Sequence, residues 1–255
     1  MNSAKRLYDL FYEAKSSRSQ EASYKLWIKI FQLDGEPPEQ HEEIGSSCMT
    51  AIREELESMM AALEDRGVPN ELLRSSFDSL RAVVSPTQFS AGWNHLADRV
   101  GQEHLTMLRW ADWALDGAES EISQDERTRL IEDLDRLIAE FEASSIPRFT
   151  KELMLRQLNL VRKALRVYRA RGIDPVHAAL NETIGAMSTR TSQVSADLNH
   201  ADSEAKSIFG KAADMINRVV VVAEKAQKIQ KGIDAGIQVA HQVEKIWAAL
   251  PGIGS

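Results

Sequence analysis

Residues 123–172 constrain the fold most strongly, because two long apolar patterns flank a single proline turn. Ser123 and Glu126 have the spacing of a capping box, which predicts that a helix begins there. Its apolar stripe comprises Leu130, Leu134, Leu137, Ile138 and Phe141. After Pro147 a second stripe comprises Phe149, Met154, Leu158, Val161, Leu165 and Tyr168, before Gly172 ends the run. Two facing stripes joined by a short turn predict an αα-hairpin.

Helical spacing of apolar residues recurs through nearly the whole chain, which predicts an all-α helical bundle. The chain has 255 residues, of which 43% are hydrophobic and 27% charged, a mixture typical of a folded globular protein. We expect an N-terminal bundle over residues 1–187. Residues 188–203 hold many serines and threonines and predict either a polar linker or a weakly packed helix. A C-terminal amphipathic region should follow over residues 204–255.

The C-terminal region carries one long apolar stripe, whose spacing alternates strictly between four and three residues as far as Ile229. This spacing is typical of a coiled-coil seam or of a helix with one apolar face. We therefore expect a homo-oligomer, or contact with a membrane, through this face. Its residues are Ile208, Met215, Val219, Val222, Ile229, Ile233, Ile237 and Trp247.

Trp110 and Trp113 lie off the apolar stripe of the helix predicted over residues 86–116. They indicate a second apolar surface, which is either a wider core or a contact with another subunit. We favour the wider core, because a central helix of a bundle is commonly apolar on more than one side.

The net charge and the cysteine content narrow the possible cellular location and binding partners of the protein. The net charge of −7 argues against general nucleic-acid binding, which needs a basic surface. Cys48 is the only cysteine and excludes an intramolecular disulfide. The N-terminus lacks the pattern of a signal peptide, and no stretch predicts an ordinary transmembrane helix. We expect a cytoplasmic protein that associates with the inner membrane.

Catalytic and metal-binding patterns are lacking in the sequence. Cys48 lies on an apolar stripe and should be an inert buried thiol. His95 and His104 should both face inward from one helix. Asp174 with His177, and Asp197 with His200, have carboxylate–imidazole spacing, but a di-metal bundle also requires glutamates on two further helices. We predict no catalytic residue, no metal site, no cofactor and no enzymatic activity.

A basic run interrupts this acidic chain. Between Leu153 and Ile173 there are six basic residues and no acidic one, and Arg162, Arg166 and Arg169 share one helical face. These three could bind a phosphate-bearing ligand through bidentate contacts. The alternatives are a solvated basic face or a partner for the acidic segment 39–65.

A family resemblance rests on three stretches. They read Leu-Asn-Leu-Val-Arg-Lys-Ala-Leu-Arg-Val-Tyr over residues 158–168, Arg-Gly over 171–172, and Ala-Ala-Leu-Asn-Glu-Thr-Ile-Gly over 178–185. The chain resembles bacterial all-helical proteins similar to the membrane effector of the Hailong anti-phage system. In that system, a nucleotidyltransferase makes oligonucleotides that hold an oligomeric effector inactive. The resemblance implies a non-enzymatic defence effector, controlled by an oligonucleotide and acting on membranes as an oligomer; the alternative is a cytoplasmic scaffold or adaptor.

Overall fold

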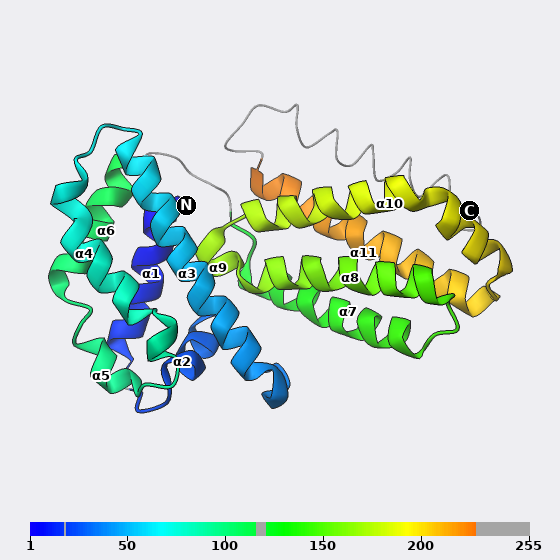
Figure 1. The fold of residues 1–255 in the computed structure, drawn as a ribbon, viewed down its shortest axis with the longest axis horizontal. Helices are drawn as coiled ribbons and strands as arrows, with labels where there is room; N and C mark the ends of the chain where they lie inside the picture. Colours follow the sequence, from blue (N-terminus) through cyan, green and yellow to red (C-terminus); the bar gives the residue numbers. More distant parts are fainter. Residues whose placement is uncertain (18, 116–120, 228–255) are drawn as a thin grey trace. The chain divides into compact units, whose positions relative to one another are not determined.

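The computed structural model describes residues 1–17, 19–115 and 121–227, and this part of the chain is all-α, with helices and no strand (Figure 1). The predicted fold class is therefore confirmed. The chain divides into two compact units, and the helical hairpin does not fall wholly in either. The first unit combines residues 1–119 with 166–172, and the second combines residues 120–165 with 173–255. Each unit is described separately.

The first unit is built around α1 and α3. Its helices are α1 (Ser3–Ser16), α2 (Ser23–Ile30), α3 (His41–Glu64), α4 (Asn70–Val83), α5 (Trp93–Ala97), α6 (Gln102–Ala114) and α9 (Tyr168–Arg171). The rings of Phe11 and Trp93 each meet the ring of Trp27 edge-on, with centroid distances of 5.8 and 5.3 Å. Trp93 also donates from Nε1 to the carbonyl of Ala14 at 2.8 Å, so its polar atom is satisfied inside the core.

The prediction of a single helix over residues 86–116 is wrong. These residues form a 3-10 turn, α5 and α6 instead. Gly92 and Gly101 precede the two α-helices, each with extended backbone angles. The N–H of Gly101 donates to His104 Nδ1 at 2.8 Å, which satisfies a backbone group at the start of α6. His104 is therefore buried as a helix-capping residue, whereas His95 is exposed.

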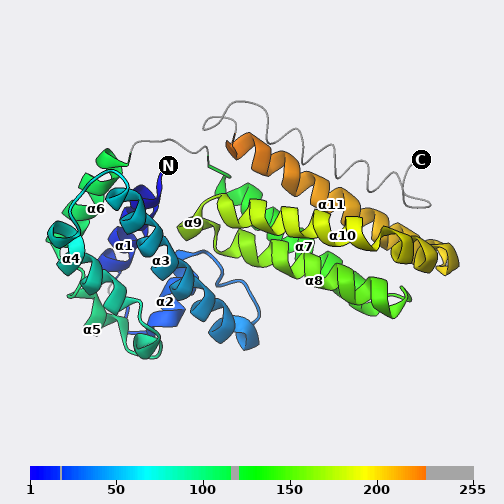
Figure 2. The same cartoon turned by 45° about the horizontal axis from the view of Figure 1, so that its top comes forward.

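The second unit is a four-helix bundle of α7 (Gln124–Ala143), α8 (Arg148–Arg166), α10 (Asp174–His200) and α11 (Ser203–Gln227), which lie side by side in Figures 1 and 2. Ser123 accepts from the N–H of Glu126 at 3.3 Å, as the cap predicts. The turn at Pro147 joins α7 to α8, so the αα-hairpin is present. Its second helix ends at Arg166 rather than near Gly172, which has a φ of 63° after α9.

The polar segment 188–203 is not a linker. Residues up to His200 continue α10, so the alternative of a helix is the correct one, and the expected division into residues 1–187 and 204–255 is not observed. Val194 and Leu198 are fully buried and lie one turn apart, which is enough to anchor this end of α10 in the core. Thr189 and Thr191 bond back to carbonyls one turn earlier, so their hydroxyls do not interrupt the helix.

The described part of the C-terminal stripe lies inside the bundle. Ile208, Met215, Val219 and Val222 are buried on α11, which packs against α7 and α10. A second buried row on α11, which the sequence analysis missed, comprises Phe209, Ile216 and Val220. The remaining predicted positions, Ile229, Ile233, Ile237 and Trp247, lie outside the described residues. Within the described ranges, no helix has both the length and the apolarity needed to cross a bilayer.

Candidate functional site

Two of the three arginines that are predicted to bind an anion already form ion pairs inside the first unit. Arg166 donates from Nε to Glu36 Oε1 at 2.9 Å and from a terminal nitrogen to the other carboxylate oxygen, a bidentate pair. Arg169 donates to Glu13 Oε2 at 2.9 Å. Both guanidinium groups are therefore already neutralised by carboxylates of the same unit.

The neighbouring Arg171 and a buried arginine from α1 extend these contacts. Arg171 lies 3.2 Å from Glu54 and 3.7 Å from Glu55. Arg6 pairs with Glu55 at 2.5 Å and donates to the carbonyl of Ala170 at 3.0 Å. The segment 166–172 is thus fixed to α1 and α3 by charge-assisted hydrogen bonds, and the Arg171 contacts agree with the alternative that the basic run partners the acidic segment 39–65.

The third predicted arginine, Arg162, belongs to the second unit. Its guanidinium donates to Asp135 on α7 and to Asn159 Oδ1 one turn earlier on α8. A phosphate ligand at any of the three arginines must displace a carboxylate. The phosphate site therefore stays a prediction, and the structure does not assemble Arg162, Arg166 and Arg169 into one site within either unit.

A polar clasp joins α7 and α11 in the second unit. Lys211 Nζ lies 2.7 Å from Glu140, and a terminal nitrogen of Arg218 lies 2.8 Å from Asp133. Together these two pairs, hereafter the α7–α11 clasp, border the buried apolar face of α11. Because all four side chains are partly exposed, each pair contributes at most about 1 kcal/mol to stability.

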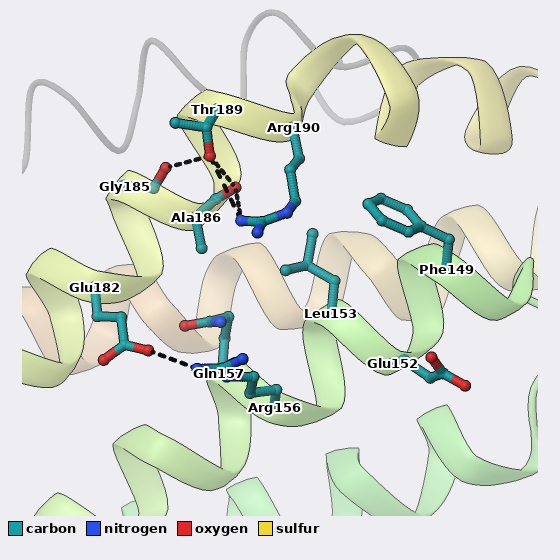
Figure 3. A pocket seen from close by; sticks show the side chains of 10 residues that line it. All are labelled: Phe149, Glu152, Leu153, Arg156, Gln157, Glu182, Gly185, Ala186, Thr189 and Arg190. Carbon is teal, nitrogen blue, oxygen red and sulfur yellow. Dashed lines mark hydrogen bonds and ion pairs between the residues drawn. The ribbon is translucent and has the colours of Figure 1, made fainter.

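A groove of about 640 Å³ runs between α8 and α10 on the same unit (Figure 3). Helix α8 contributes Phe149, Glu152, Leu153, Arg156 and Gln157. Helix α10 contributes Glu182, Gly185, Ala186, Thr189 and Arg190. The groove is open because α10 presents small residues opposite Leu153, and a Cβ on Gly185 would meet no atom within 4 Å.

Polar groups with unused bonding capacity line this α8–α10 groove. Gln157 is only 2% exposed, and Thr183 Oγ1 approaches its Oε1 at 3.3 Å, which leaves the amide nitrogen without a partner in the described residues. Arg156 and Glu182 form a loose pair at 3.6 Å across the groove. Among the described residues, Arg190 donates only to oxygens of its own helix turn, Ala186 O at 3.4 Å and Thr189 Oγ1 at 3.5 Å.

A second groove, of about 860 Å³, lies between the start of α7 and the end of α11. Its lining includes Asp125, Arg129, Asp214 and Lys225, so acidic and basic side chains again alternate. Arg218 also lines this groove but is already part of the α7–α11 clasp.

The two tryptophans of α6 are exposed, so the prediction of a wider core is wrong. Trp110 is 40% exposed and Trp113 is 78% exposed. The buried side of α6 carries Leu105, Leu108 and Ala111, and both tryptophans fall on the opposite side of the helix. The other alternative, a contact with another subunit, stays a prediction.

Within the described ranges, the structure contains no cluster of three or more metal-ligating side chains. Cys48 is fully buried, as its position on an apolar stripe predicts. His177 is half-buried, and burial lowers the pKa of its imidazole, an effect partly opposed by the carboxylate of Asp174. No protein-family model, no curated protein and no solved structure matches this chain.

Proposed function

We propose that this chain is a non-enzymatic bacterial defence effector whose second unit keeps the apolar face of α11 covered until a ligand acts. The observation that carries the proposal is the position of that face. Ile208, Met215, Val219 and Val222 are buried in a single chain, and the basic side chains of the clasp lie along its border.

The free energy of burying these side chains favours release of α11 by a ligand over spontaneous release. Burial of an aliphatic side chain contributes about 1.5 to 3 kcal/mol, so these four side chains hold α11 in place with roughly 6 to 12 kcal/mol. The clasp adds at most about 2 kcal/mol. A discrimination of about 5.5 kcal/mol moves a two-state equilibrium from 1:99 to 99:1, so a ligand that frees α11 must discriminate between the two states by more than this.

A released α11 has the composition of an interfacial helix. Its apolar rows would lie on one side, and Lys211, Arg218 and Lys225 would lie on the exposed side, where they attract anionic lipid headgroups. In this proposal the chain acts on the inner membrane as an oligomer once α11 is freed.

The experiment measures dye release from anionic phospholipid vesicles with the full chain. The variant Glu140→Lys with Asp133→Lys reverses both acidic residues of the clasp and keeps the basic residues of α11 that attract anionic lipid. It should release dye about tenfold faster, because repulsion replaces attraction between α7 and α11. Adding Lys211→Glu and Arg218→Glu restores the pairs with opposite polarity and should return the rate to that of the wild type. The effector proposal is wrong if the reversed variant and the restored variant leave the vesicles equally sealed and circular dichroism shows that both are folded.

A scaffold or adaptor is the second candidate, and the exposed Trp110 and Trp113 favour it. Tryptophan is enriched among the residues that dominate binding energy at protein interfaces. The adaptor therefore predicts that Trp113→Ala abolishes capture of a partner or lowers the mass measured by light scattering, while vesicles stay sealed under every condition.

A further inference from the structure

The α8–α10 groove has charges of both signs around an apolar floor, and this combination selects among ligand classes. Arg156 and Arg190 are basic, whereas Glu152 and Glu182 are acidic. A polyanion would be repelled by the carboxylates and a polycation by the guanidinium groups. A ligand with one ammonium and one carboxylate can pair with both.

The ion pairs within the described residues leave some charged side chains of the groove available to bind a ligand. Glu152 accepts from Arg148 Nε at 2.6 Å, so it is already paired. Within residues 1–17, 19–115 and 121–227, Glu182 has only the loose contact with Arg156, and Arg190 has only weak contacts with its own turn. Glu182 is therefore suited to an ammonium group, and Arg190 to a carboxylate, which its planar guanidinium can bind bidentately.

The spacing of these two residues sets the ligand length. Eight positions separate Glu182 from Arg190, which corresponds to about 12 Å along α10. In Figure 3 the Arg190 side chain folds back toward Ala186, which shortens this span. An extended peptide covers about 3.3 to 3.6 Å per residue, so about three residues bridge the two charges.

The apolar part of the groove can pack against an apolar side chain of such a peptide. Leu153 points from α8 toward α10 and lies beside the guanidinium of Arg190, near Ala186 (Figure 3). Gln157 is almost completely buried, yet one end of its amide is unpaired among the described residues. A ligand or water that reaches this end of the amide can complete its hydrogen bonds. A peptide amide can do so.

From these observations we propose that the α8–α10 groove binds a short zwitterionic peptide of about three residues with an apolar central side chain. The ammonium group pairs with Glu182, the terminal carboxylate pairs with Arg190, and the central side chain packs on Leu153. A role for this peptide as the controlling ligand rests on the proposed function. Binding itself is independent of membranes, so the two proposals can fail separately.

The test is calorimetric titration of the full chain, without lipid, using the tripeptide Ala-Leu-Ala with free termini. The same peptide with an acetylated amino end and an amidated carboxyl end lacks both charges and should bind at least about tenfold more weakly. Free leucine is too short to bridge the two residues and should also bind at least about tenfold more weakly. Added salt should weaken binding of the free tripeptide, because the paired charges are accessible to water.

Variants locate the binding within the groove. Glu182→Gln and Arg190→Gln should each weaken binding at least about tenfold. Gly185→Phe should abolish it by filling the groove, since a Cβ at this position meets no atom within 4 Å. The matched controls are Arg74→Gln, an exposed arginine of the first unit, and Ser188→Phe, an exposed position of α10 outside the groove; both should bind as the wild type does. The proposal is overturned if the capped peptide binds equally well, if Gly185→Phe has no effect, or if the free tripeptide does not bind at millimolar concentration.

Discussion

Arg166 and Glu36 form a bidentate ion pair across 130 positions of sequence, with side chains that are only 11% and 7% exposed. The pair fixes the segment that follows α8 into the first unit. We expect Arg166→Gln to lower the free energy of unfolding of that unit by about 3 kcal/mol, because Glu36 is left buried without its counter-charge. Tryptophan fluorescence in a urea titration reports this loss, since Trp27 and Trp93 are buried in the same unit.

The control for Arg166 is Arg156→Gln, which breaks an exposed pair and should change stability by less than about 0.5 kcal/mol. Combining Arg166→Gln with Glu36→Gln should recover part of the loss, because the unpaired buried charge is then removed. Equal losses in the two single arginine variants would contradict a buried ion pair.

The helical hairpin and the fold class could be predicted from the sequence because they depend on local periodicity. The stripes of α7 and α8 are buried where the 3.6-residue period places them, except for the half-buried Phe149, and the cap at Ser123 is present. The composition of residues 188–203 is typical of a linker, whereas the spacing of Val194 and Leu198 is typical of a helix. Val194 and Leu198 alone supply the buried face there, and the serines and threonines occupy the remaining positions.

The partners of the arginines could not be predicted, because a periodic pattern on one helix does not say which distant residue faces it. Arg162, Arg166 and Arg169 share a helical face in the sequence, yet they meet Asp135, Glu36 and Glu13 respectively. The groove between α8 and α10 was missed for the same reason. Its signal is the small pair Gly185 and Ala186, which becomes informative only when Leu153 is known to lie opposite.

Two valines of α11 that lie two positions apart distinguish the buried face from the exposed one. Val219 is 1% exposed, and Val221 is 48% exposed. Val219→Asp should destabilise the second unit by more than about 3 kcal/mol, because it buries an unpaired carboxylate and loses apolar contacts. Val221→Asp should be within about 0.5 kcal/mol of the wild type.

Urea unfolding followed by circular dichroism measures both valine variants. The comparison also shows which substitutions suit vesicle experiments, since a protein that unfolds cannot test release of α11. Similar effects of the two substitutions would mean that α11 is not held in the bundle as described.

Binding of an oligonucleotide at Arg162 has a distinctive consequence, because Asp135 already occupies the guanidinium group. Asp135→Asn removes the competing charge and should strengthen binding of a short single-stranded oligonucleotide by about tenfold, while Arg162→Gln should abolish it. Fluorescence anisotropy at several salt concentrations measures both, and binding should weaken as salt rises. If neither substitution changes binding, Arg162 has a purely structural role.

The pH dependence of stability should report the burial of His177. Burial lowers the pKa of this imidazole below its ordinary value of 6.5, so the unfolded chain takes up a proton at a pH where the folded chain does not. Stability is therefore fully present above pH 6.5 and falls as the pH drops toward the folded pKa, with a slope below the one-proton limit of about 1.4 kcal/mol per pH unit.

The variant His177→Asn isolates this effect, because the other histidines are the same in both proteins. The stability difference between the wild type and the variant should change between pH 7 and pH 5 in the direction that penalises the wild type at low pH. Asp202 does not interfere in this range. Hydrogen bonds from the N–H of Ala205 and the hydroxyl of Ser145 lower its pKa below 3.8, so it titrates in more acidic solution. A difference that stays constant from pH 7 to pH 5 would show that His177 can accept a proton in the folded bundle without cost.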